Sequence, residues 1–275
     1  MSARSPTCAP SGTERRTTGR HAIAGRLSRA LAACALAALV AAFPDVPVLA
    51  NGCGPAVTLD IGHSPGRHGA TSARGKAEYR FNRRFAQELA KVLEAGGIGP
   101  VRILNAAGAD LTLKERAAEI RTLGEGILLS IHHDSVQPQY LSRWSDRGTE
   151  RPYSDLFRGY SLFVSNRGGA YGRSVDLART IGRSLQADGF RASLHHAEAI
   201  PGENRPIVDA ENGVFRHDGL AVLKNAPVPA VLVEVGVILN RAEETDLEDA
   251  GYRARFQAAI AAAVATFCAA AEPAK

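Results

Sequence analysis

Short apolar runs alternate with amphipathic segments between residues 56 and 267. A short run with few polar residues predicts a strand buried on both faces, and apolar residues three and four positions apart predict a helix packed on one side. The expected strands are 56–61, 101–104, 126–132, 160–164 and 230–235, and the expected helices are 77–95, 112–123, 174–186 and 252–267. This alternation predicts an α/β domain with a mostly parallel or mixed sheet and helices on both of its faces.

The first 50 residues differ from the rest of the chain in charge and in hydrophobic pattern. They contain six arginines, no lysine and two acidic residues, and so supply +4 of the formal net charge of +5. An apolar run over 30–43 follows the arginines, and Val48-Leu49-Ala50 is typical of a signal peptidase site. We therefore expect residues 1–50 to be an export signal peptide that is removed, with 51–275 as the single mature domain.

This apolar run is too short for a stable membrane span, which needs roughly twenty residues. A retained anchor is therefore the weaker alternative. Cys34 lies in a sequence that resembles a lipidation site, and Arg15-Arg16 in one that resembles a twin-arginine signal. The export route stays open, and we expect the protein in the periplasm or the extracellular cell envelope.

The composition of the whole chain excludes several classes of protein. The 45% hydrophobic content, with only 27 Gly, 14 Pro and 4 Cys, excludes collagen, a disordered chain and a disulfide-dense miniprotein. Without the first 50 residues the chain carries 27 basic and 26 acidic residues, a net charge of +1. A near-neutral domain with few aromatic residues argues against a nucleic-acid partner.

Two cysteines, Cys53 and Cys268, lie near the two ends of the mature chain. Disulfides persist in exported proteins, so a bridge between the two residues is one expectation and a pair of free thiols is the other. Their spacing does not match a CxxC redox or zinc-ribbon motif.

Ionisable side chains lie at the carboxyl ends of the expected strands, where functional residues gather in such folds. His63 follows the first strand, His132 ends the third, and Glu234 interrupts the apolar run over 230–235. A carboxylate in such a run is costly to bury unless it is paired or bound to a metal, so we expect a group that compensates Glu234. Glu78 opens the first helix and lies near the first strand end. Two histidines and two carboxylates fit a zinc hydrolase with one open metal position.

Each of these residues also has an ordinary structural interpretation. His63 suits a turn after a strand, and Glu78 suits the first turn of a helix, where the helix dipole favours an acid. His132-His133-Asp134 could form a polar strand exit, and no HExxH motif is present. The residue types and their spacing leave both interpretations open.

Four motifs, in order along the chain, resemble those of the zinc-dependent N-acetylmuramoyl-L-alanine amidases of the amidase_3 type. These enzymes cut stem peptides from the glycan strands of peptidoglycan. The motifs are Asp60-Ile61-Gly62-His63, Glu78 with Asn82, Ser130-Ile131-His132, and Pro229-Ala230-Val231-Leu232-Val233-Glu234-Val235-Gly236 continued to Asn240. Together they cover roughly residues 56–267.

The resemblance implies that His63, Glu78 and His132 bind Zn²⁺ and that Glu234 is the catalytic carboxylate. Zinc would polarise the carbonyl and activate water, and Glu234 would carry the proton to the leaving nitrogen. His133 is the ambiguous neighbour, but alternate side chains of a strand face opposite sides, which favours His132 alone. Asp60 is expected to orient a zinc ligand or to bind strand-end amides. The resemblance implies peptidoglycan as the partner, with a protein activator as a further one.

Two regions depart from the family pattern. The stretch 135–158, which carries Trp144, is longer than the usual connection, and is expected to be an occluding lid, a substrate-gripping element or a plain surface loop. His195 and His196 have no family counterpart. They suggest either a second metal site or side chains that line the cleft, where His217 and Arg205 or Arg216 would contact the substrate.

The sequence therefore predicts a peptidoglycan hydrolase that cleaves the amide bond between N-acetylmuramic acid and the L-alanine of the stem peptide. Two alternatives remain. One is another zinc-dependent peptidase or amidohydrolase of similar architecture, and the other is a catalytically silent cell-wall binding module. All four site positions carry the required residue types, which argues against the silent module.

Overall fold

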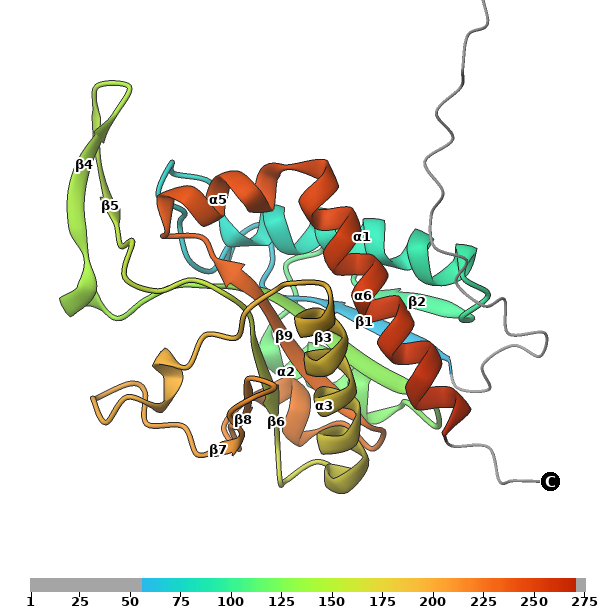
Figure 1. The fold of residues 1–275 in the computed structure, drawn as a ribbon. Helices are drawn as coiled ribbons and strands as arrows, with labels where there is room; N and C mark the ends of the chain where they lie inside the picture. The colour runs from blue at the N-terminus through green and yellow to red at the C-terminus, as the bar shows by residue number, and fades with distance from the viewer. Residues whose placement is uncertain (1–55, 271–275) are drawn as a thin grey trace, which may run out of the picture. The chain divides into compact units, whose positions relative to one another are not determined.

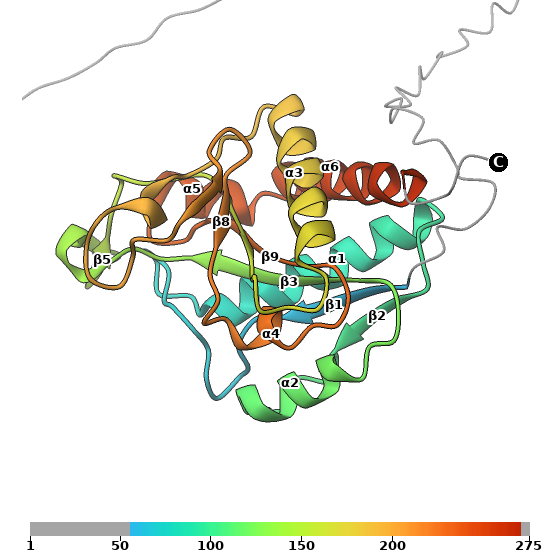
Figure 2. The ribbon, with the colours of Figure 1, turned by 90° about the horizontal axis from the view of Figure 1, so that it is seen from below.

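A computed structural model of the chain describes residues 56–270, which form a seven-stranded sheet, a two-stranded hairpin and the helices around them (Figures 1 and 2). The strands of the sheet, in spatial order, are β2 (Val101–Leu104), β1 (Val57–Ile61), β3 (Ile127–Asp134), β9 (Ala230–Val237), β6 (Ser161–Val164), β8 (Val214–Arg216) and β7 (Ile207–Asp209). The predicted α/β architecture is confirmed.

The sheet is parallel on one side and mixed on the other. Strands β2, β1, β3 and β9 run parallel, whereas β6 is antiparallel to β9, β8 is parallel to β6, and β7 is antiparallel to β8. The carboxyl ends of β1, β3 and β9 therefore meet at one edge of the sheet. This edge is where the predicted site residues lie.

Helices cover both faces of the sheet and bury two separate hydrophobic layers. One layer contains the apolar residues of three long helices and the other those of two short helices. A further helix, α5, follows β9 directly. The helices are α1 (Glu78–Ala95), α3 (Tyr171–Ala187) and α6 (Ala250–Ala269) on the first face, α2 (Leu113–Arg121) and α4 (Ala221–Lys224) on the second, and α5 (Arg241–Glu248).

The helix boundary signals in the sequence hold in the structure. The Thr112 hydroxyl accepts a hydrogen bond from the Glu115 backbone N–H, and the Glu115 carboxylate accepts one from the Thr112 N–H, so the two residues form a capping box at the start of the expected helix 112–123. The first helix ends at Gly96-Gly97, and Gly97 has a φ of 72° that favours glycine.

The stretch 135–158 contains regular structure that the hydrophobic pattern did not predict. It comprises the 3₁₀ helix η1 (Pro138–Tyr140) and the hairpin of β4 (Ser142–Asp146) and β5 (Thr149–Tyr153), which projects from the body of the fold in Figure 1. Both strands are exposed or half-buried, so their sequence lacks the apolar alternation that marks a packed strand. Strands β7 and β8 and helices α4 and α5 are short, and the hydrophobic pattern did not predict them either.

Three expectations concern the ends of the chain. No helix among residues 56–270 is long and apolar enough to cross a membrane. Cys268 is disulfide-bonded. Its expected partner Cys53 and the predicted signal peptide over 1–50 lie outside the described residues.

Candidate functional site

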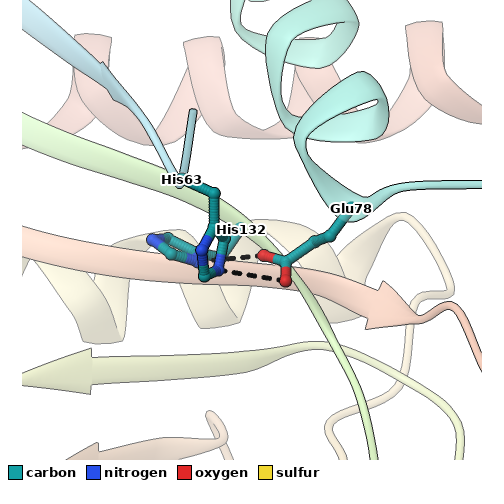
Figure 3. A group of neighbouring side chains, drawn as sticks. All are labelled: His63, Glu78 and His132. Carbon is teal, nitrogen blue, oxygen red and sulfur yellow. Dashed lines mark hydrogen bonds and ion pairs between the residues drawn. The ribbon is translucent and has the colours of Figure 1, made fainter. Parts of the chain in front are cut away.

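Three of the predicted site residues, His63, Glu78 and His132, converge at the carboxyl edge of the sheet (Figure 3). The Nε2 atom of His63 lies 3.1 Å from Oε2 of Glu78, and Nδ1 of His132 lies 3.0 Å from Oε1 of the same carboxylate. The potential ligand atoms of all three residues lie within 4.8 Å of one another. We refer to these residues as the first cluster.

The parallel pairing of β1 and β3 brings the two histidines together. Ile61, the last residue of β1, is in register with Ile131, so the chain that leads on to His63 leaves the sheet beside His132 of β3. Glu78 reaches the same place because it is the first residue of α1, whose amino end packs against this edge. The Asn82 amide, one helical turn further on, donates to Glu78 Oε1 at 3.0 Å and to the Gly62 carbonyl at 3.1 Å. Asn82 thus ties the helix to the β1 end.

Two glycines make room for the first cluster. A β-carbon at Gly62 would lie 2.5 Å from Nε2 of His132, and one at Gly69 would lie 2.3 Å from Oε2 of Glu78. Gly69 also has a φ of 76°, and His63 itself has a φ of 65°. The glycine of the Asp-Ile-Gly-His motif is therefore required because the His132 imidazole lies against its backbone.

The electrostatics of the first cluster suit cation binding. Burial alone would raise the pKa of Glu78, but hydrogen bonds and charge interactions with His132 and His63 hold it well below its usual value. Glu78 is therefore a carboxylate at neutral pH. Two imidazole nitrogens and one carboxylate oxygen are donors that zinc accepts, and with three protein ligands a position stays open for water or substrate.

His133 faces away from this cluster, which removes the ambiguity between the two neighbouring histidines. Its Nδ1 atom lies 2.7 Å from Oδ1 of Asn82, and its ring packs between Phe81 and Phe85 at centroid distances of 5.4 and 6.0 Å. Burial lowers the pKa of His133 to about 3, so it is neutral at ordinary pH. Successive side chains of β3 point to opposite faces, which separates His132 from His133.

Glu234 lies beside His132, with which it is in register across the β3–β9 pair. Its Oε2 atom is buried and has no hydrogen-bond partner among the described residues. Burial raises the pKa of Glu234 well above its usual value, and the negative charges of Asp134 and Glu78 raise it further. Within 56–270 no group donates a hydrogen bond to this Oε2 atom, and only the charge of His196 acts against the rise in pKa.

Asp60 contacts no side chain of the first cluster. The Ser130 hydroxyl donates to Asp60 Oδ2 at 2.6 Å, and Arg116 of α2 lies 3.4 Å from Oδ1. The same guanidinium donates to the backbone carbonyl of His63. Asp60 therefore supports His63 through Arg116, a residue that no sequence motif indicated.

The other polar residues singled out in the sequence divide into two groups. His195 and His196 lie against Asp134, a residue that was not predicted to take part in a site. Arg205, Arg216 and His217 instead have local partners: Arg205 donates to the Gly202 carbonyl, Arg216 lies 3.4 Å from Asp218, and His217 accepts from the Gly219 N–H. None of these three residues forms a hydrogen bond or an ion pair with Glu78 or Glu234.

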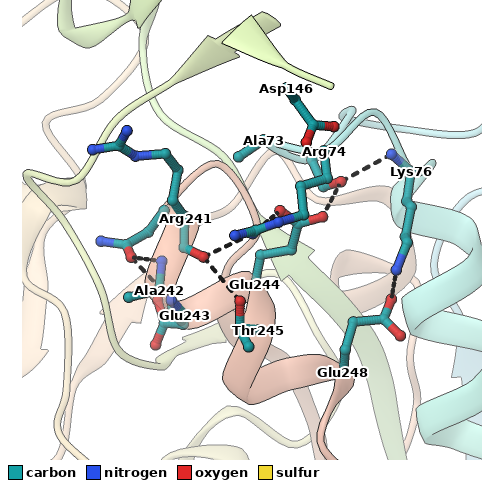
Figure 4. Close-up of polar contacts among 12 residues, drawn as sticks. Ala73, Arg74, Lys76, Asp146, Arg241, Ala242, Glu243, Glu244, Thr245 and Glu248 are labelled. Atoms are coloured by element: carbon teal, nitrogen blue, oxygen red, sulfur yellow. Dashed lines mark hydrogen bonds and ion pairs between the residues drawn. The ribbon is translucent and has the colours of Figure 1, made fainter. Parts of the chain in front are cut away.

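The loop between β1 and α1, which leads to Glu78, is braced by ion pairs (Figure 4). Arg74 lies 2.8 Å from Glu244, and Lys76 lies 2.9 Å from Glu248, both in or at the end of α5. Trp144 of the hairpin donates its indole N–H to the Ala73 carbonyl at 3.1 Å. The hairpin therefore contacts the loop that positions the first cluster.

Comparison with known proteins relates this fold and site to one family. The model of the family described as N-acetylmuramoyl-L-alanine amidase matches residues 57–266. The match covers the sheet and includes every residue of the first cluster and Glu234.

Individual relatives agree with the family match. N-acetylmuramoyl-L-alanine amidase AmiA of Escherichia coli is 26% identical over 218 residues, which are 77% of this chain and 75% of the relative. The crystal structure of the amidase Ami1 from Mycobacterium smegmatis is similar with a TM-score of 0.60 at 23% identity, over 79% of this chain and 98% of that one. The CwlD amidase of Clostridioides difficile, solved in complex with the GerS lipoprotein, gives a TM-score of 0.59 at 19% identity over 78% and 99%.

Proposed function

Because the chain belongs to the N-acetylmuramoyl-L-alanine amidase family, we propose that it hydrolyses the amide bond between N-acetylmuramic acid and L-alanine in peptidoglycan, with Zn²⁺ bound by His63, Glu78 and His132. The observation that carries the proposal is the convergence of these three donors within 4.8 Å, beside a carboxylate, Glu234, on the next strand.

The residues of the first cluster fit a catalytic zinc ion in donor type and in number. Zinc bound there would polarise the substrate carbonyl and lower the pKa of a water molecule toward neutrality. The half-exposed His63 leaves one side of the cluster accessible, whereas Glu78 is buried and held by Asn82 and the Ala70 N–H. Substrate would therefore approach from the side of His63.

Glu234 is proposed as the proton carrier. A carboxylate with a raised pKa is a stronger base than an ordinary one, so it takes a proton from water more readily. Glu234 would accept a proton from the attacking water and return it to the nitrogen of the leaving L-alanine. One carboxylate can serve both steps because the proton that it takes from the water is the one that it returns to the nitrogen.

Other residues position this machinery without contacting substrate. Asn82 orients Glu78, and Arg116 holds the His63 backbone with the support of Asp60. Gly62 leaves the space that the His132 ring occupies. These contacts restrict the orientation of all three donor groups.

The proposal includes the cellular context. A peptidoglycan substrate requires the enzyme in the periplasm or the extracellular cell envelope, which agrees with the predicted removal of residues 1–50 as a signal peptide and with 51–275 as the mature catalytic domain. A protein activator stays a prediction. The CwlD complex shows that a protein of this fold can bind a lipoprotein partner.

Mass spectrometry of the soluble products after incubation with purified peptidoglycan tests the proposal. We expect free stem peptides with L-alanine at their amino terminus, and we expect their release to stop with a chelator and with Glu234→Gln. The exposed Glu211→Gln serves as the matched control and should release stems at the wild-type rate.

Two results would contradict the proposal. Peptides cleaved within the stem would indicate a peptidase of similar architecture instead. Absence of any product, with binding to peptidoglycan retained, would indicate a silent wall-binding module, provided that the hairpin-shortened variant described below is inactive as well.

A further inference from the structure

We propose that Asp134, His195 and His196 form a second binding site for a divalent transition-metal cation of the Zn²⁺ class. The potential ligand atoms of these three residues lie within 4.8 Å of one another, and all three residues are buried. We refer to them as the second cluster. This inference goes beyond the proposed hydrolysis and does not depend on it.

Two imidazole nitrogens converge on one carboxylate oxygen in the second cluster. Nε2 of His195 lies 3.2 Å and Nε2 of His196 lies 2.8 Å from Oδ2 of Asp134. The other oxygen, Oδ1, accepts from the Ser135 N–H at 2.7 Å. His195 Nε2 is buried and forms no hydrogen bond within the part of the chain that the structure describes, despite its short distance to the carboxylate. This nitrogen offers its electron pair to a cation when the ring proton is on Nδ1.

The other ring nitrogen of each histidine, Nδ1, already has a polar partner. Nδ1 of His195 lies 2.8 Å from the Ser193 hydroxyl, and Nδ1 of His196 lies 2.8 Å from Oε2 of Glu203. Glu203 in turn accepts from the Gln137 amide at 2.7 Å. Metal-binding histidines characteristically donate their second N–H to such partners, which fixes the tautomer and turns Nε2 toward the metal. Both histidines show this arrangement.

The charges around the second cluster favour a cation. Asp134 and Glu203 both contact His196, and Glu234 lies near enough for the negative charge of Asp134 to affect it. No lysine or arginine among residues 56–270 pairs with any of these three carboxylates. The negative charge of several buried acids is costly unless a positive charge compensates it. Either a metal ion or a proton on His196 supplies that charge.

Aromatic side chains surround the buried second cluster. Phe157 stacks on His195 at a centroid distance of 4.9 Å, and Phe163 lies edge-on to His196, also at 4.9 Å. The Ser193 N–H donates to the Tyr160 carbonyl at 2.8 Å, which attaches the segment before the histidines to the sheet. Imidazole and carboxylate donors in an enclosed pocket suit zinc and neighbouring transition metals more than calcium or magnesium, which favour oxygen ligands.

Metal content of the purified protein, measured by elemental analysis after dialysis against buffered Zn²⁺, tests the site. The double variant His63→Asn/Glu78→Gln removes the first cluster, so any remaining zinc belongs elsewhere. We expect two zinc ions in the wild type, one in the double variant, and none when His195→Gln is added to it. His217→Gln added to the double variant is the matched control and should retain one.

The outcomes separate this inference from the proposed function. One zinc in the wild type and none in the double variant would overturn the second site and leave the first intact. One zinc in the wild type that is lost with His195→Gln alone would support the second site and contradict zinc binding at the first. Retention of zinc when His195→Gln is added to the double variant would overturn the inference, because the metal would then be bound elsewhere.

A milder change keeps the test valid if His195→Gln unfolds the protein. Glu203→Gln leaves all three ligands in place and removes only the carboxylate that orients His196. In the double-variant background we expect it to weaken zinc binding by about 10- to 100-fold, the usual effect of losing such a partner. We also expect zinc to raise the melting temperature of the double variant. Two results together would overturn the inference: a zinc affinity that Glu203→Gln does not change, and a melting temperature of the double variant that zinc does not raise. They would show that a proton occupies the site.

Discussion

The two clusters share strand β3 and the same types of donor, but they differ in exposure. The side chains of His63 and His132 are 33% and 14% exposed in the first cluster, whereas those of His195 and His196 are 2% and 11% exposed in the second. An open set of three ligands can admit water and substrate, and an enclosed set cannot. This difference in exposure, more than residue type, is why we propose the chemistry for the first cluster and a binding role for the second.

The clusters also differ in how the chain assembles them. The first is built at the ends of regular elements, from two parallel strands and the first turn of α1. In the second, only Asp134 belongs to the sheet, while both histidines come from the short 3₁₀ helix η2 (His195–Ala197) in a long connection. The residues that orient the ligands follow the same division: Asn82, which orients Glu78, lies on a helix, and Glu203, which orients His196, lies on a loop.

The largest expected effect is the difference in activity between a variant of Glu78, the acid of the first cluster, and a variant of Asp134, the acid of the second. Glu78→Gln removes a proposed zinc ligand next to the reaction, and we expect kcat/KM on peptidoglycan to fall by about 10³-fold or more, comparable to the loss of a catalytic group. Asp134→Asn should lower it by about tenfold or less, because the enclosed cluster does not contact substrate. Release of dye-labelled fragments from peptidoglycan measures both. Equal losses would show that the two clusters act as one catalytic centre.

A change in the space around His132 should have the next largest effect. Gly62→Ala places a β-carbon 2.5 Å from Nε2 of His132, so the imidazole must move. We expect an activity loss of about 10²-fold, typical of a misplaced catalytic group, with zinc at the second cluster retained. Gly124→Ala is the control, because a β-carbon there meets nothing within 4 Å. Wild-type activity of Gly62→Ala would mean that His132 does not need its observed position.

A smaller effect is expected from the hairpin. Replacement of residues 142–153 by a short turn keeps Gln137 and Asp155, which bond to Glu203 and Arg241, but removes the Trp144 bond to the Ala73 carbonyl. We expect kcat/KM to fall about fivefold, equivalent to one hydrogen bond of about 1 kcal/mol, since the loop to Glu78 loses a brace. Trp144→Phe should reproduce most of the loss. A rise in activity would indicate an occluding lid, and unchanged kinetics would contradict both roles.

The titration of Glu243 is expected to have the smallest effect on the two clusters. It changes the free energy of unfolding of the fold instead. Burial raises the pKa of Glu243 from 4.5 to about 7, although the Val237 and Gly159 N–H groups that donate to it oppose the shift. The folded state therefore keeps a proton that the unfolded state releases between these values. The resulting stability is complete below pH 4.5 and is lost as pH rises through about 7, at up to about 1.4 kcal/mol per pH unit.

Urea unfolding across this pH range checks the expectation. The free energy of unfolding should decline with pH more steeply in the wild type than in Glu243→Gln, which carries no titrating group there. Parallel curves for the two proteins would show that Glu243 keeps an ordinary pKa. The exposed Glu211→Gln provides the control and should follow the wild type.

The pattern of apolar residues was enough to predict the central elements and the polar residues at their ends, whereas the choice of His63, Glu78 and His132 as one set came from the resemblance of the four motifs. Strands β1, β3 and β9 are buried on both faces, and their mostly apolar runs record that burial directly. A polar residue within or after such a run, as at His132 or Glu234, is conspicuous because burial there needs a reason. The topology of parallel strands then requires their carboxyl ends to meet at one edge.

The second cluster and the hairpin depended on information that no local pattern contains. Asp134 meets His196 across 62 positions of sequence, and Arg116 meets His63 across 53. The sequence favoured His132 over His133, but the place of the His133 ring beside Phe81 and Phe85 of α1 depended on the packing of β3 against that helix. A hydrophobic pattern records how deeply a residue is buried, whereas contacts between distant segments depend on the path of the loops, which carry no periodicity and are placed by the packing of the whole domain.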